Sequence, residues 1–183
     1  MAVLALRHSD FLDKGARLYG LSADSPAQNA AVMEKLALTF PILSDEDREA
    51  AIKPLGFADE KDPRQISRPG VVIVSTDGEI VHRSTGRDFA DRPDEDDLLE
   101  HLAALGLEPA TQDPPEVGTP EPGEKAMALE GIPHYLRGAK FASLALRSRH
   151  RDIDEDFKDD AKGYVQMVDR YIEAITAAQE RKG

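Results

Sequence analysis

The chain has 183 residues, enough for one compact domain with an appendage. Hydrophobic residues make up 40% and charged residues 32%, which is a globular composition, and the formal net charge of -12 argues against binding to a phosphate backbone. No apolar run approaches the roughly 20 residues that span a bilayer. We therefore expect a cytoplasmic protein with no nucleic-acid partner and no membrane association.

The first third of the chain predicts a helix, a strand and a second helix. Apolar residues recur at helical spacing from Val3 to Lys14, and Gly15 ends this helix. Residues 17–22 form a short, mostly apolar run that indicates a buried strand. Ser25 is placed to cap a helix over residues 27–38.

The middle of the chain predicts a short extended segment, a helix and a β-hairpin. Pro41 limits the segment 40–44 to a sheet edge, and acidic residues at 45–47 favour a helix that runs to Leu55. Residues 71–74 are the strongest strand in the sequence, and Asp77-Gly78 predicts a hairpin to a second strand over residues 79–83. An apolar stripe then predicts a helix from about Asp91 to Leu105.

Beyond this helix the composition changes. Five prolines and several acidic residues between Glu108 and Gly123 predict a linker. Residues 126–147 and 157–181 both show helical patterns, so we expect a helical hairpin. The predicted division is a domain over residues 1–107, a Pro-rich linker over 108–123 and a C-terminal helical hairpin over 124–183.

Three phrases of the sequence resemble the alkyl hydroperoxide reductase and thiol-specific antioxidant (peroxiredoxin) family. They are GLSADSP at residues 20–26, FPILSD at 40–45 and RPGVVIV at 68–74, followed by Asp77-Gly78. The resemblance covers roughly residues 3–105. It implies an α/β fold with a thioredoxin-like sheet and flanking helices, and a relationship to oxidoreductases that act on hydroperoxides or disulfides.

The resemblance also implies two active-site residues. Arg68 matches the arginine that activates the family's cysteine thiolate, and Pro69 matches a proline that thioredoxin-like folds keep in the cis form. The thiolate is the nucleophile, and positive charge beside it favours its formation. Because this sequence has no cysteine at all, we expect the chain to be redox-inactive as written.

The central strand of a thioredoxin-like sheet is also missing, because it would precede the first helix and lie between the strands at 17–22 and 71–74. Three solutions are open: the two flanking strands close up, a partner or a second copy donates a strand, or an upstream segment carries it. We hypothesise that an N-terminal segment with the strand and the cysteine has been lost.

Other constellations are weak. The five histidines stand singly, without the spacing of a metal site, so we expect no metal and no cofactor, and we expect surface or half-buried histidines. In the C-terminal hairpin, bulky and small residues alternate from Tyr135 to Leu146. This segment either packs on the chain's own domain or forms a surface for a homo-oligomer or another protein. Two functions remain: a peroxiredoxin-like protein without its nucleophile, or a non-catalytic interaction module.

Overall fold

The computed structural model describes residues 1–60, 62–63, 66–86, 91–150 and 154–182. Its contacts divide the chain into two compact units. Unit 1 consists of Met1–Leu6, Lys35–Leu38 and Gly123–Gly183, and unit 2 consists of Arg7–Glu34 and Thr39–Pro122. The division into residues 1–107, 108–123 and 124–183 stays a prediction.

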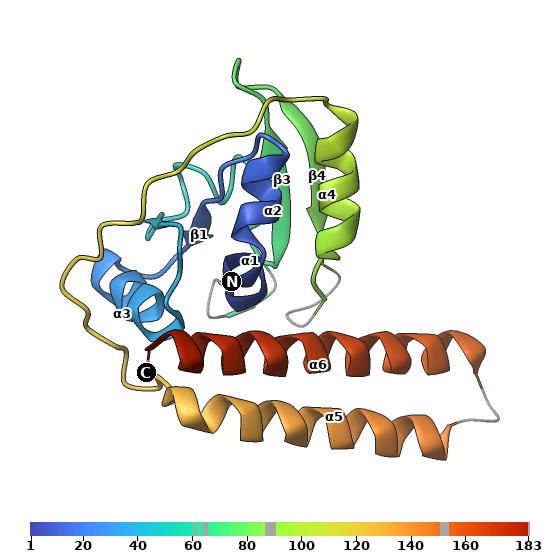
Figure 1. Cartoon of the computed structure of the whole chain (residues 1–183). Coiled ribbons are helices and arrows are strands. Elements are labelled where there is room, and N and C mark those ends of the chain that lie inside the picture. Colours follow the sequence, from blue (N-terminus) through green and yellow to red (C-terminus); the bar gives the residue numbers. More distant parts are fainter. Residues whose placement is uncertain (61, 64–65, 87–90, 151–153, 183) are drawn as a thin grey trace. The chain divides into compact units, whose positions relative to one another are not determined.

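Two small sheets and several helices make this a mixed α/β structure (Figure 1). In unit 2, β1 (Gly20–Ser22) pairs in parallel with β2 (Ile42–Ser44), and β3 (Gly70–Val74) pairs antiparallel with β4 (Ile80–Thr85). The predicted hairpin is confirmed, with Gly78 at a φ of 90° in its turn. The pairs β1–β2 and β3–β4 are separate sheets, so β1 and β3 have not closed up on each other.

The sheets leave two strand edges open. Gly20 N–H donates to Pro41 O and Asp45 N–H donates to Ser22 O, so β1 bonds to β2 through Gly20 and Ser22. The N–H and C=O of Leu21 therefore point away from β2. On β3, Gly86 N–H donates to Pro69 O. Because hydrogen-bonded residues alternate along an antiparallel pair, the N–H and C=O of Val72 point away from β4. No described strand pairs with either of these edges.

The first predicted helix is divided in two. Helix α1 (Ala2–Leu6) and helix α2 (His8–Asp13) are separated by Arg7, whose φ and ψ are -104° and 14°. The Arg7 guanidinium bonds to Asp10 at 3.0 Å and to Asp96 at 2.6 Å. Within unit 2, α2 contacts α4 (Glu95–Ala104).

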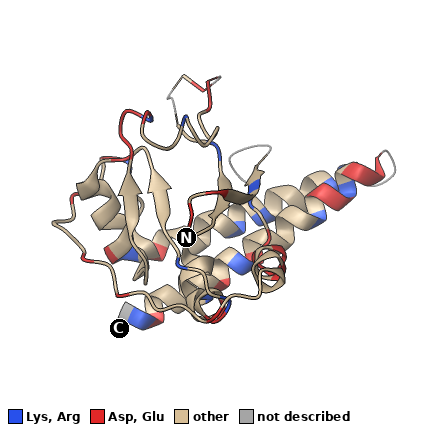
Figure 2. Ribbon diagram, turned by 90° about the horizontal axis from the view of Figure 1, so that it is seen from above, with Lys and Arg blue, Asp and Glu red and all other residues tan. Residues whose placement is uncertain are grey.

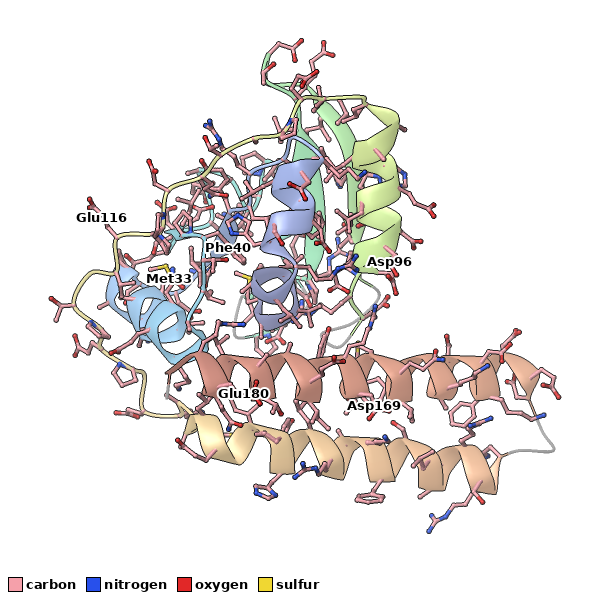
Figure 3. The ribbon with its side chains drawn as sticks, in the orientation of Figure 1. Met33, Phe40, Asp96, Glu116, Asp169 and Glu180 are labelled. Carbon is pink, nitrogen blue, oxygen red and sulfur yellow. The ribbon has the colours of Figure 1, made fainter. Side chains whose placement is uncertain are left out.

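Helix α3 (Pro26–Leu36) begins as predicted, because Ser25 Oγ accepts from Gln28 N–H and Gln28 Oε1 accepts from Ser25 N–H. The core of unit 2 forms around Phe40, which is 1% exposed (Figure 3). The other buried apolar side chains of this unit include Phe11, Ala30, Met33, Ile42, Ile52, Phe57, Leu98 and Leu102.

The Pro-rich segment contains no helix or strand. Hydrogen bonds from its backbone and from Gln112 hold it against the rest of unit 2. The amide of Gln112 pairs with Leu18, accepting from its N–H at 2.8 Å and donating to its C=O at 2.7 Å. The Gln112 oxygen also lies 3.0 Å from His8 Nε2. His8 is buried, so the expectation of a surface or half-buried side chain was wrong there, because Gln112 satisfies the ring nitrogen.

The helical hairpin consists of a 3₁₀ turn, η1 (Leu129–Gly131), then α5 (Ile132–Arg149) and α6 (Glu155–Lys182). In unit 1, α6 contacts both α5 and α1. Its core joins Ala2 and Val3 to Ala174 and Ile175. Lys140 on α5 bonds to Asp169 on α6 at 2.7 Å (Figure 3). None of the described helices is both long and apolar enough to cross a bilayer.

Candidate functional site

The candidate site lies in unit 2, in the loop before β3. Arg68 N–H donates to Phe57 O at 2.7 Å, and Ala58 and Ser67 form an antiparallel bridge one step further into the loop. These contacts hold the two ends of the loop together at its base. Arg68 is therefore fixed by its backbone, while its side chain is exposed.

Two guanidinium groups converge on Gly56. Arg68 Nη2 donates to Gly56 O at 3.4 Å. From β4, Arg83 Nη2 lies 2.6 Å from the point that a Cβ on Gly56 would occupy. Gly56 also has a φ of 70°, which L side chains rarely adopt, so its conformation favours glycine, and a side chain there would displace the Arg83 guanidinium. We call Gly56, Arg68 and Arg83 the arginine site.

A turn-rich segment, rather than the predicted helix, leads from β2 to this site. The Asp45 carboxylate is buried and accepts the backbone N–H groups of Ala50, Ala51 and Ile52 at 3.1, 2.9 and 2.7 Å. The prediction of a helix over residues 45–55 was wrong, because the carboxylate takes N–H groups that a helix would bond to its own carbonyls. Arg48 also adopts a φ of 66°, outside the helical region.

The same bonds change the acidity of Asp45. The backbone N–H of Ile52, followed by those of Ala51 and Ala50, holds the pKa of the Asp45 carboxyl below its ordinary value, because these bonds favour the ionised form. Burial opposes this effect but is the smaller influence compared with the Ile52 bond. Asp45 therefore serves as an ionised anchor for the segment that ends at Gly56.

Pro69 follows Arg68 and is half-buried. The described residues contain no cis peptide bond, so the cis form implied for Pro69 is not found. The trans form of an X–Pro bond is favoured by about 0.5–1 kcal/mol unless the surroundings select the cis form.

A second group of polar side chains gathers between β4 and α4. The rings of His82 and His101 lie 4.2 Å apart, and His101 Nδ1 lies 2.7 Å from Asp97 O. They border a cavity of about 250 Å³, which is also lined by Ser84, Pro93, Asp94, Asp97, Leu98 and Glu100. The two histidines are distant in the sequence, and the fold brings them together. Among the described residues, no group of three side chains is arranged to hold a metal ion.

The chemistry of the arginine site is electrostatic. Two exposed cations beside Gly56 favour a negatively charged group next to them, and a thiol placed there would ionise more readily. This chain supplies no such thiol, since it contains no cysteine.

Comparison with known proteins finds a family model that covers the part of the chain containing the arginine site. The model of the AhpC/TSA family matches residues 1–83, which includes both arginines. Residues 1–83 are an AhpC/TSA family domain. The resemblance read from the sequence is thereby confirmed for this part of the chain.

Two curated relatives come from Mycobacterium tuberculosis. They are Putative peroxiredoxin MT2597 of strain CDC 1551 / Oshkosh and Putative peroxiredoxin Rv2521 of strain ATCC 25618 / H37Rv. Each is 37% identical over 76 residues, which is 39% of this chain and 48% of the relative. The chain therefore spans about half the length of the curated relatives it matches. No solved structure matches the chain significantly.

Sequence reasoning identified Arg68 and Pro69 but missed Gly56 and Arg83. Register counting could have found Arg83. The hairpin turn at Asp77-Gly78 pairs Val72 with Arg83, which brings Arg83 to the same strand pair that Arg68 precedes. Gly56 was placed in a loop without a role, because only the folded chain brings both guanidinium groups to it.

Proposed function

We propose that this chain descends from thiol-dependent oxidoreductases that act on hydroperoxides or disulfides and is redox-inactive in this cysteine-free form. One combined observation carries the proposal: residues 1–83 match the AhpC/TSA family while none of the 183 residues is cysteine. Family membership supports the ancestry. The missing sulfur nucleophile supports the lack of activity.

Other side chains are poor substitutes for a thiolate. Serine hydroxyls near neutral pH remain protonated and react slowly without an adjacent base. Methionine is oxidised to a sulfoxide, which is a modification rather than a catalytic cycle without a separate reductase. Met33 is buried, and its sulfur accepts the N–H of Ile42 at 3.3 Å. It is therefore part of the core.

In the proposed fold, β1 and β3 belong to one thioredoxin-like sheet that lacks its central strand. The open edges at Leu21 and Val72 support this proposal, because a strand between them would accept hydrogen bonds on both sides. A donated strand, from a partner or a second copy, would complete the sheet. Arg68 and Arg83 would favour a negatively charged group on that strand.

Peroxide consumption by the purified full chain, measured with a small thiol reductant, tests the proposed inactivity. We expect the rate to equal the buffer rate. An Arg68→Ala variant serves as the matched control, because a real active site that used Arg68 would lose rate on this change. Turnover above the buffer rate that falls in the variant would contradict the proposal.

The alternative function is a non-catalytic interaction module. The observation that favours it is the exposure of large apolar side chains on α5, among them Tyr135 and Phe141. A cytoplasmic location remains part of the proposal.

A further inference from the structure

The side of α5 that faces away from α6 is unusually apolar for a solvent-exposed surface. Tyr135 is 64% exposed, Phe141 is 69% exposed and Leu146 is 47% exposed. Pro133 is the buried residue of this helix. Ile132 and Leu136, on the opposite side, already pack against the core of unit 1. The exposed apolar residues are therefore not the face that holds the hairpin together.

A regular stripe runs along this exposed side. Tyr135, Gly138, Ala142, Ala145 and Arg149 follow one another at alternating intervals of three and four residues, and all five are exposed. This spacing places them on one face of a helix. Phe141 and Leu146 border the stripe. We call these five positions the α5 stripe.

Gly138 has no role in the packing of its own chain. A Cβ added to it would meet nothing within 4 Å, and a glycine inside a helix is less stable than an alanine. The distance between two packed helices depends on the side chains at their contact. Gly138, with Ala142 and Ala145, allows another helix to approach closely.

The charges on α5 favour one orientation of a partner. The helix contains four cations, Arg137, Lys140, Arg147 and Arg149, and no acidic residue. The exposed Glu130 lies just before its first turn. In the described part of the chain, Arg147 and Arg149 form no hydrogen bond or ion pair through their side chains.

We propose that the α5 stripes of two copies of this chain pack antiparallel about a two-fold axis near Ala142. This register sets Gly138 of one copy opposite Ala145 of the other, and Tyr135 opposite Arg149, where the guanidinium can lie on the aromatic ring. It also directs the arginine-rich last turn of each copy toward Glu130 of the other. A parallel pairing would instead set Arg149 against Arg149.

The charge of the whole chain argues against a polyanion as the partner, so it is the pairing of Arg149 with Tyr135 and Glu130 that favours a second copy. A formal net charge of -12 opposes approach to a nucleic acid or an anionic bilayer, although α5 itself is basic (Figure 2). A helix of 18 residues is about 27 Å long and about 10 Å wide, so the contact is smaller than the roughly 800 Å² per partner of a standard interface. The dimer is therefore weak and depends on protein concentration.

Sedimentation equilibrium of the full chain over a wide range of concentrations tests the dimer. We expect a monomer–dimer equilibrium, and Ala142→Glu should weaken association by about tenfold or more, because it sets two carboxylates against each other at the axis. The matched control is Leu144→Glu, which adds the same charge to α5 away from the stripe and should leave association unchanged. Circular dichroism of each variant checks that the helices are intact.

A charge exchange tests the antiparallel orientation. Arg149→Glu alone should weaken association, and the double variant Arg149→Glu with Glu130→Arg should restore it. A wild-type chain that remains monomeric at every concentration would overturn the proposal. Equal effects of Ala142→Glu and Leu144→Glu, or no recovery in the double variant, would do the same.

Discussion

The strands of unit 2 and the helical hairpin of unit 1 satisfy their backbone groups in different ways. Helix α6, with 28 residues, bonds its N–H groups to its own carbonyls and needs neighbours only for its side chains. Strands β1 and β3, with 3 and 5 residues, bond on one side and leave Leu21 and Val72 facing outward. A helix can therefore satisfy its backbone groups without a neighbouring segment, while a sheet that lacks a strand has N–H and C=O groups without a partner along the open edge.

The two regions also differ in where their apolar side chains lie. Phe40 in unit 2 is 1% exposed, while Phe141 on α5 is 69% exposed. The strand-containing region buries the rings of Phe11, Phe40 and Phe57 but leaves its backbone edges open. The helices of the hairpin bond their main chains internally between their ends but leave Tyr135 and Phe141 exposed. The surface without a partner is thus a strand edge in one region and a set of exposed apolar side chains on α5 in the other.

The largest expected effect is the loss of a buried side chain in either region. Phe40→Ala should lower the free energy of unfolding by about 3–5 kcal/mol, and Ile175→Ala in the hairpin core by about 2–4 kcal/mol. Tyr19→Ala, at a residue that is 56% exposed, is the control and should change it by less than about 0.5 kcal/mol. Urea denaturation measures all three. Similar small effects for Phe40 and Tyr19 would show that unit 2 has no packed core.

Replacing glycine by alanine should change the free energy of unfolding in opposite directions at two positions. Gly56→Ala should destabilise the chain by about 1–2 kcal/mol, because its positive φ is costly for an L residue. Gly138→Ala should stabilise α5 by up to about 1 kcal/mol, since the added Cβ meets no neighbour. Thermal unfolding at low protein concentration compares them. Stabilisation by Gly56→Ala would contradict the geometry of the arginine site.

The smallest expected effect is the pH dependence due to Asp45. Its folded-state pKa is depressed, so its contribution is present above the unfolded-state pKa of about 3.9 and is lost as the pH falls through the lower folded-state value. Stability measured from neutral to acidic pH should therefore decline less steeply in Asp45→Asn than in the wild type. Glu46→Gln, at an exposed neighbour, is the control. Identical pH profiles for wild type and Asp45→Asn would count against this anchor.

Local patterns in the sequence predicted much of the fold. The periodicity of α4 and α6, the Ser25 cap and the Asp77-Gly78 turn depend on residues close together in the chain. The break at Arg7 was missed, because that side chain bonds to Asp96, 89 residues away. The turns after β2 were missed, because a helix-favouring acidic start was outweighed by the bonds that Asp45 makes to Ala50, Ala51 and Ile52.

The candidate site was predicted only in part for the same reason. Arg68 could be named because it stands in a contiguous phrase that resembles a family. Arg83 joins it through the register of the hairpin, which follows from the Asp77-Gly78 turn, and Gly56 joins it through a loop closure that no local pattern specifies. The His82–His101 pair likewise forms across two elements that are distant in sequence.

Native-state hydrogen exchange of the full chain tests most directly whether the sheet strands have open edges while the hairpin does not. Exchange resolved to single amides compares Leu21 and Val72 with the amides of α6 between Ala161 and Ala178. The account predicts that Leu21 and Val72 exchange far faster than those α6 amides, because they have no partner strand. Protection of Leu21 and Val72 equal to that of α6 would contradict it.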